Sequence, residues 1–361
     1  MRILMVGHYD LEGYSRGRIL YKGLKKNKVE VDIFLGKGKL KYLRILKRVL
    51  KKDYDAIIAT GTTTLFVVKF IKEFSIIKKP LILDSFISNY DTLVHDRKIV
   101  SENSLKARIL WFTDKYSCKF ADNAIVDTKQ HKEYFVEEFD LDPKKFEIVP
   151  IGADDEIFYP RNFEENKKNG EEFNVTFFGS FIPLQGMQYI LKSAKILENY
   201  NIIFNLIGEG QTFPEMKKLA RKLELRNVNF LGWKRIYELP NFIANSDVCL
   251  GIFGNTEKAK RVIPNKVYEV IAMKKPIVTG DTPAIREFFR NRENSLLCEI
   301  ANPDAIADAI LELKDNPELR EKIAKNGYKL FRENFSIEGI GKTLKIILNR
   351  ILDEEINICS I

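Results

Sequence analysis

The apolar residues of this chain gather in short runs bounded by Gly, Pro, Asn and Asp. Such runs are typical of parallel strands that are covered on both faces of a sheet. In the amino-terminal half we expect strands at residues 2–6, 29–34, 56–59, 80–83, 123–126 and 146–150. In the carboxyl-terminal half we expect strands at residues 173–178, 202–207, 228–231, 248–252 and 276–279.

Between these runs, apolar residues recur every three or four positions, which is the spacing of an amphipathic helix. We expect helices near residues 16–26, 111–120, 129–139, 213–223, 304–313, 318–331 and 337–352, and one that begins near Pro264. Alternating strands and helices indicate an α/β protein with Rossmann-like parallel sheets. A charged run at residues 161–172 marks a linker, so we place the domains at residues 1–160 and 161–335, followed by a final helix at 336–361.

Length and composition fit this division. A chain of 361 residues with 45% hydrophobic content is too long for one ordinary core and rich enough for two. A strand opens the sequence without a signal peptide, and no apolar run approaches the length of a membrane span, so we expect a cytoplasmic protein. The four cysteines and three histidines are scattered, which argues against disulfides and a zinc site. Cys249 and Cys298 fall in predicted strands, where a free thiol behaves as a small hydrophobic residue.

The formal net charge of +9 is compatible with a nucleic acid, an anionic membrane or a phosphorylated substrate. The basic residues are not interleaved with aromatic residues in a recognised module, so we expect no nucleic-acid partner. Residues 39–52 (KLKYLRILKRVLKK), from Lys39 to Lys52, contain no acid. At helical spacing, one side of this segment is apolar and the other is basic. It is either a helix packed on the first sheet or a peripheral anchor on the anionic inner face of the cell membrane.

Residues 245–289 carry the richest chemistry. Beyond the carboxyl end of the strand at 248–252, the helix that begins near Pro264 would aim its free amides at a phosphate. Its apolar positions fall on one face, and Lys266 and Glu269 fall on another, toward a crevice. Glu269 could accept hydrogen bonds from a ribose diol, and nearby cations would attract phosphate: Lys258, Lys260, Arg261 and Lys266. Alternatively, Glu269 complements the helix dipole and the lysines form a solvated face.

The run from Pro264 to Glu269 (PNKVYE), then AMKKPIV at 272–278 and IRE at 285–287, resembles the donor-site signature of family 4 glycosyltransferases of the GT-B fold. The resemblance implies two Rossmann-like domains facing a central cleft, with the acceptor on the first, the donor on the second, and a final helix crossing back. It also implies a nucleotide-sugar donor, a sugar or lipid-linked acceptor and retention of anomeric configuration. Glu269 would hold the ribose. Arg261 stands where many members have another glutamate, so the contact with the transferred sugar stays open.

The same resemblance extends to glycine-bearing loops. Gly13 would face the donor phosphates, although a simple turn glycine is the alternative. Members commonly carry an arginine and a lysine at the positions of Ser180 and Gln185, so two phosphate-binding cations are missing here. Trp233 would line the base pocket or belong to the core. The donor-site residues we predict are Gly13, Gly179, Ser180, Gln185, Gly186, Gly208, Trp233, Lys258, Arg261, Lys266 and Glu269.

On the acceptor side, polar residues crowd positions 84–92, just beyond a predicted strand. Many members place a histidine near this strand, and His95 is the nearest candidate. Asp84 and Asp91 compete with it for a catalytic role, and an ordinary surface histidine is the alternative. The two D-x-D matches, at residues 53–55 and 140–142, precede a strand and a turn, so we expect no metal cofactor. A GT-B sugar-nucleotide epimerase and a basic nucleic-acid-binding protein are the alternatives to a glycosyltransferase.

Overall fold

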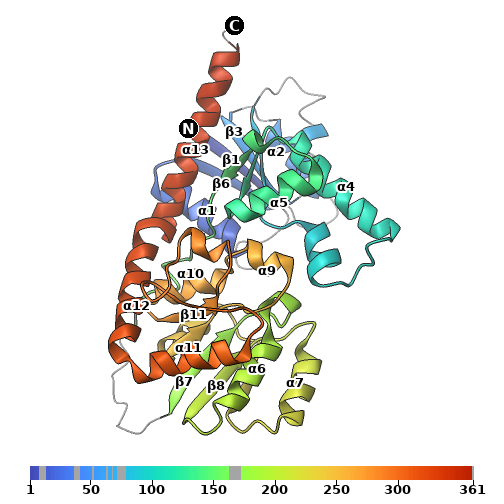
Figure 1. Ribbon diagram of the computed structural model, residues 1–361. Helices are drawn as coiled ribbons and strands as arrows, with labels where there is room; N and C mark the ends of the chain where they lie inside the picture. Colours follow the sequence, from blue (N-terminus) through green and yellow to red (C-terminus); the bar gives the residue numbers. More distant parts are fainter. Residues whose placement is uncertain are drawn as a thin grey trace. The chain divides into compact units, whose positions relative to one another are not determined.

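The computed structural model describes residues 1–7, 14–35, 41–50, 53–61, 64–66, 68–70, 79–161 and 172–359. The chain divides into two compact units. Unit 1 comprises Met1–Gly152 and Phe335–Ile361, and unit 2 comprises Ala153–Asn334. Each unit is built on one parallel sheet with helices, as the alternation of strands and helices predicts (Figure 1).

Unit 1 contains a six-stranded sheet in the order β2-β1-β3-β4-β5-β6, and every neighbouring pair is parallel. Its strands are β1 (Arg2–Gly7), β2 (Glu30–Leu35), β3 (Ala56–Thr60), β4 (Leu81–Asp84), β5 (Asn123–Val126) and β6 (Phe146–Ile148). The chain reverses direction across the sheet between β1 and β3, and open α/β sheets bind ligands beyond the carboxyl ends of strands at such a point. The loop after β1, which holds Gly13, lies outside the described residues.

The helices of unit 1 are α1 (Ser15–Lys26), α2 (Lys41–Val49), α4 (Leu105–Phe120), α5 (Lys129–Phe139) and α13 (Ile337–Cys359), with a π-helix at Asp91–Asp96. α4 begins well before the expected start at residue 111. Ser104 explains the early start, because its side chain accepts a hydrogen bond from the backbone N–H of Ala107 and caps the helix. Leu105 and Ile109, near the start of α4, are exposed, so they do not extend the buried periodicity.

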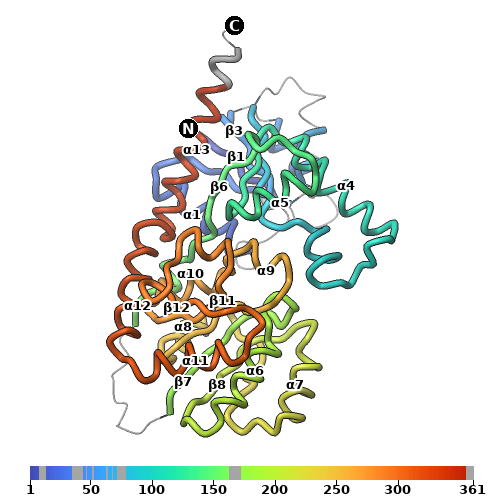
Figure 2. The backbone as a smooth tube through the Cα atoms, in the orientation of Figure 1, coloured from blue at the N-terminus to red at the C-terminus, as the bar shows by residue number. Residues whose placement is uncertain are grey.

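The carboxyl-terminal helix α13 packs against α1 within unit 1, which confirms the predicted return to the first domain. Figure 2 shows the red end of the chain running beside the blue beginning. The two helices meet at glycines, since a Cβ atom at Gly341 would lie 2.1 Å from the backbone of Gly23. Lys345 Nζ donates to the carbonyl of Asn27 at 2.8 Å and adds a polar tie.

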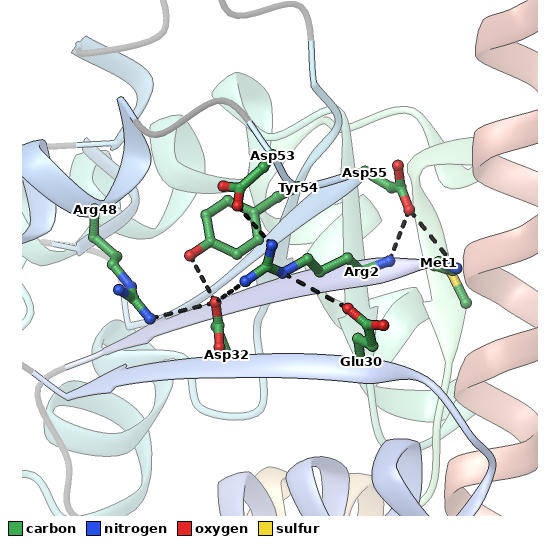
Figure 3. A network of polar contacts seen from close by, with 8 residues as sticks. All are labelled: Met1, Arg2, Glu30, Asp32, Arg48, Asp53, Tyr54 and Asp55. Carbon is green, nitrogen blue, oxygen red and sulfur yellow. Dashed lines mark hydrogen bonds and ion pairs between the residues drawn. The ribbon is translucent and has the colours of Figure 1, made fainter.

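At the amino ends of the unit 1 strands, a polar network surrounds Arg2 (Figure 3). Its guanidinium donates to Asp53 at 2.6 Å and to Asp32 at 3.0 Å, and Asp32 also pairs with Arg48 of α2 at 3.3 Å. Ile45 and Val49 of α2 are buried in the core. The described part of the segment from Lys39 to Lys52 is therefore a helix packed on the unit, with Arg44 and Lys47 exposed.

Unit 2 contains a six-stranded parallel sheet in the order β12-β11-β10-β7-β8-β9. Its strands are β7 (Phe173–Phe178), β8 (Ile202–Ile207), β9 (Val228–Gly232), β10 (Val248–Leu250), β11 (Ile277–Gly280) and β12 (Leu296–Cys298). Its helices are α6 (Met187–Ile196), α7 (Phe213–Lys222), α8 (Leu239–Ala244), α9 (Glu257–Arg261), α10 (Asn265–Ala272), α11 (Pro303–Asp315) and α12 (Pro317–Leu330). The chain reverses direction between β7 and β10, which places the switch point of this sheet at their carboxyl ends.

Cys118, Cys249 and Cys298 are free and buried, and Cys249 and Cys298 lie in strands as predicted. Burial raises the pKa of each of the three thiols to about 12. These residues therefore act as small apolar side chains. No helix formed by the described residues combines enough length with enough apolar character to cross a bilayer.

Candidate functional site

At the switch point of unit 2, loops that carry glycines bring their backbones into close contact. A Cβ atom at Gly208, after β8, would lie 2.0 Å from the carbonyl oxygen of Gly179, after β7. Gly186 has a φ of +71°, and a Cβ there would lie 2.5 Å from the backbone of Gly254, after β10. Side chains at Gly186 and Gly208 would therefore push the loops apart. The glycines leave backbone amides close to whatever binds at this edge.

Lys266 lies in the first turn of α10 and is 4% exposed. Its Nζ donates a hydrogen bond of 2.6 Å to Oε1 of Gln185 and lies 3.5 Å from the ring centroid of Phe177. A Cβ atom at Gly179 would lie 3.2 Å from the same Nζ. The amine therefore reaches the loop that lacks the two cations common in the family.

Burial lowers the pKa of Lys266 well below its usual value, and the nearby carboxylate of Glu269 offsets only part of this effect. An anion arriving beside the amine would favour its protonated form. Burial, a specific charge partner and a place at the switch point together make Lys266 a candidate functional residue.

We expected α10 to bury one face and to present Lys266 and Glu269 on the other, but every residue from Lys266 to Ala272 is buried. The helix is eight residues long and contacts both β11 and α12, so little of its surface is left to solvent. The solvated-face alternative is therefore wrong for Lys266, and it is also wrong for Lys258, which is 8% exposed on α9. Glu269 lies in the second turn of α10, where the helix dipole is weak.

The other predicted donor-site residues differ in their placement and exposure. α9, which carries Arg261, packs on the turn Pro183–Gln185 that leads to Gly186. Ser180 is exposed. Trp233 follows Gly232, whose carbonyl accepts from the N–H of Gly208 at 2.9 Å, and its side chain is 67% exposed. The core alternative for Trp233 is therefore wrong.

In unit 1, the predicted catalytic residue Asp84 is buried at the end of β4. It accepts hydrogen bonds of 2.7 Å from Nε of Arg16 and from the hydroxyl of Tyr14. Burial opposes the charge of Arg16, but Asp84, Tyr14 and Asp127 outweigh this effect and raise the pKa of the guanidinium. Each carboxylate oxygen of Asp84 therefore accepts one hydrogen bond, and the carboxylate neutralises the charge of Arg16.

The other two catalytic candidates lie together on the π-helix. Nδ1 of His95 is 3.9 Å from Oδ1 of Asp91, and the imidazole packs edge-on against Tyr90 with ring centroids 4.8 Å apart. The side chain of His95 is one-third exposed, whereas that of Asp91 is buried. The structure therefore pairs His95 with Asp91, while Asp84 makes its contacts with Tyr14 and Arg16.

A buried pair that sequence reasoning missed follows β5. Nδ1 of His131 lies 2.6 Å from Oδ1 of Asp127, and both side chains are inaccessible to solvent. Nε2 of His131 has no hydrogen-bond partner within the described ranges. The available signal was an aspartate at a strand end and a histidine four residues later in the first turn of a helix. The scatter of histidines along the sequence hid this pair, because spacing alone does not report burial.

Among the described residues, no group of three or more His, Cys, Asp or Glu side chains is arranged to hold a metal ion. Three of the four carboxylates of the predicted D-x-D matches have other contacts. Asp53 pairs with Arg2, and Asp55 accepts from the Arg2 N–H at 2.7 Å. Asp142 accepts from the N–H of Lys144 and caps a short turn.

Two parallel Rossmann-like sheets with helices define the architecture as GT-B, and solved structures of similar fold support this class. The crystal structure of Anabaena HepE in complex with UDP matches with a TM-score of 0.71 and 15% sequence identity, over 97% of this chain and 100% of that chain. Residues 158–330 match the family model described as glycosyl transferases group 1. Over these residues, the match confirms the resemblance to group 1 glycosyltransferases seen in the sequence.

Curated relatives belong to the same class. An uncharacterized glycosyltransferase of Methanocaldococcus jannaschii is 28% identical over 249 residues, which is 68% of this chain and 64% of that protein. An Escherichia coli UDP-Gal:alpha-D-GlcNAc-diphosphoundecaprenol alpha-1,3-galactosyltransferase is 22% identical over 63% of this chain and 62% of that protein. Each alignment thus covers less than two-thirds of the relative's own length.

Proposed function

We propose that this protein transfers a sugar from a nucleotide diphosphate sugar to an acceptor hydroxyl, with retention, in the synthesis of a glycan, glycolipid or polysaccharide. The observation that carries the proposal is the buried amine of Lys266, held between Gln185 and Phe177 at the switch point of the group 1 domain. Unit 2 binds the donor and unit 1 binds the acceptor.

The chemistry asked of the protein is electrostatic. Negative charge develops on the departing diphosphate, and preorganised donors in a dry site stabilise it without reorganising. The amides at the start of α10 and the amine of Lys266 supply such donors. Lys266 reaches the loop from α10, so it takes the place of the arginine and lysine that are absent at Ser180 and Gln185.

The acceptor is a sugar or a lipid-linked sugar. The named substrate of the Escherichia coli relative is a diphosphoundecaprenol-linked sugar, which supports the lipid-linked form. Peripheral attachment to the inner face of the cell membrane is part of this proposal. For residues 39–52, the described portion leaves Arg44 and Lys47 exposed for such contact.

A panel of nucleotide-sugars, incubated with and without candidate acceptors, tests the proposal. We expect release of a nucleoside diphosphate and a sugar-acceptor product only when an acceptor is present, with the anomeric configuration kept. Release of a free isomerised sugar nucleotide without acceptor would identify an epimerase instead. Stabilisation of the chain by nucleic acid, but by no nucleoside diphosphate, would point to a nucleic-acid-binding protein.

We further propose that transfer needs no divalent metal, because Lys266 and helix amides supply the positive charge. Activity in excess chelator should equal activity in untreated enzyme. Complete loss of transfer in chelator, restored by Mn²⁺, would contradict this.

A further inference from the structure

α4 carries an apolar strip along its outward side. Leu105 is 74% exposed, Ile109 55%, Phe112 50% and Phe120 38%. Together with Tyr116, these residues recur every three or four positions and so share one side of the helix. The strip runs the length of α4, about 24 Å at the helical rise. Its rings are ordered: Phe112 and Tyr116 stack 6.0 Å apart, and Tyr116 and Phe120 lie 5.5 Å apart.

The inward side of α4 is anchored, so the strip cannot turn into the core. Ala107 and Cys118 are buried there. Asp114, also buried, accepts hydrogen bonds of 2.8 Å from Oγ of Ser88 and from the N–H of Tyr90. These contacts fix the rotation of α4 and hold its apolar side outward.

Cations border the strip. At helical spacing Arg108, Lys115 and Lys119 lie along one edge and Lys106 lies along the other. Nζ of Lys115 lies 4.8 Å from the ring of Trp111, and Nζ of Lys119 lies 5.9 Å from the ring of Tyr116. The one acidic residue in the sequence of α4 is Asp114, which is buried. The outward side, which we call the α4 face, is therefore apolar in the middle and carries four cations at its edges, with Glu138 of α5 hydrogen-bonded to Trp111 beside Lys115.

We propose that the α4 face docks in the interface of an anionic lipid bilayer, with the helix axis parallel to the membrane plane. Exposed aromatic and aliphatic residues enter the boundary between headgroups and acyl chains, and lysines and arginines beside them bind anionic headgroups. A second copy of this chain fits less well, because pairing two α4 faces would oppose two sets of like charges. Charge complementarity therefore selects the bilayer.

This surface differs from residues 39–52. Among the described side chains of α2, the apolar residues Ile45 and Val49 are buried, whereas the cations Arg44 and Lys47 are exposed. In α4, apolar side chains and cations are exposed on the same side of the helix. The test of docking is independent of the proposed transfer reaction, because lipid binding is measured without donor or acceptor.

Sedimentation of the whole chain with vesicles tests the proposal. The vesicles contain phosphatidylcholine alone, or phosphatidylcholine mixed with phosphatidylglycerol. We compare an apolar variant (Ile109→Ser with Phe112→Ser) and a charge variant (Arg108→Gln, Lys115→Gln and Lys119→Gln). Two control variants remove exposed residues elsewhere in unit 1: Ile346→Ser on α13, and Lys25→Gln with Lys26→Gln on α1. Thermal unfolding confirms that each variant is folded.

We expect binding to require phosphatidylglycerol and to weaken with salt. Each α4 variant should lower the partition coefficient by about tenfold or more, and each control by less than about twofold. Equal sedimentation with both kinds of vesicle would overturn the proposal. So would loss of binding in the α1 control alone. A concentration-dependent dimer that the apolar α4 variant dissociates, without vesicle binding, would show that the face contacts protein instead.

Discussion

At the scale of single residues, Lys266 is a buried amine whose charge depends on what binds beside it. Burial lowers its pKa in the free protein, and a diphosphate would raise it. Binding of a nucleoside diphosphate should therefore take up a proton, and affinity should fall as the pH rises above the lowered pKa of the free amine. Calorimetric titration in buffers with different heats of ionisation measures the proton uptake.

We expect net proton uptake in the wild-type chain and none in Lys266→Met. Lys260→Met is the matched control, because Lys260 is partly exposed on α9 and pairs with Glu257 at 2.7 Å. An uptake that is the same in the wild-type chain and Lys266→Met would show that another group titrates.

Asp84 and Arg16 form a fully buried ion pair with a distance of 2.7 Å. Removing one partner leaves the other charge buried and uncompensated, which costs about 3–5 kcal/mol. We predict a loss of this size for Asp84→Ala in urea unfolding followed by Trp111 fluorescence in a Trp233→Phe background. Asp53→Ala, which removes an exposed partner of Arg2, should cost less than about 1 kcal/mol. Similar losses in the two variants would refute the structural role of Asp84.

Two residues of the candidate site could be predicted from their positions in a sequence motif. Lys266 and Glu269 fall in a helix-start pattern after a strand, and that pattern survives in α10. The burial of Lys266 was not predictable, because its side chain packs against Phe177 and Gln185, which are distant in sequence. Arg16 was missed for the same reason, because its partner Asp84 ends another strand and only the strand order brings the two close. His131 lies four residues after Asp127, and it was missed because spacing does not report that the pair is buried.

At the scale of elements, β5, α5, β7 and β8 have the bounds that we predicted. Apolar runs and helical spacing predict these bounds well because each of the four elements packs against the core of its own unit. Bounds differed where exposure breaks the pattern. Leu105 and Ile109 near the start of α4 are exposed, and α13 continues beyond residue 352 through the exposed residues 353 and 354.

The contact between α1 and α13 depends on small residues at the crossing. A Cβ at Gly341 would lie 2.1 Å from the backbone of Gly23, so neither helix can yield by turning a side chain. We predict that Gly341→Ala destabilises unit 1 by about 1–3 kcal/mol, the usual cost of overpacking. Amide hydrogen exchange should rise along α13. Lys342→Ala, at the exposed neighbouring position, is the control and should leave exchange unchanged. Equal exchange in both variants would contradict the close crossing.

At the scale of the whole molecule, the two sheets repeat one design, each with a reversal of strand order beside its first strand. In unit 2 the reversal gathers Lys266, Gln185 and the glycine loops. In unit 1 the same edge holds Arg16, Asp84 and the pair of Asp127 and His131. The basic α4 face belongs to unit 1, so the proposed membrane contact and the acceptor side share a unit.

The central claim is that the site around Lys266 and Glu269 of α10, in unit 2, binds the nucleoside diphosphate of a sugar donor. Calorimetric titration of the whole chain with UDP and with GDP tests it directly, using Glu269→Ala and the control Glu257→Ala, which removes an exposed glutamate on α9. We predict that one of the two nucleotides binds the wild-type chain and the control alike. Glu269→Ala should bind it more weakly by roughly 1.5–3 kcal/mol, the value of a hydrogen bond to a charged group. Failure of both nucleotides to bind, or unchanged affinity in folded Glu269→Ala, would contradict the account.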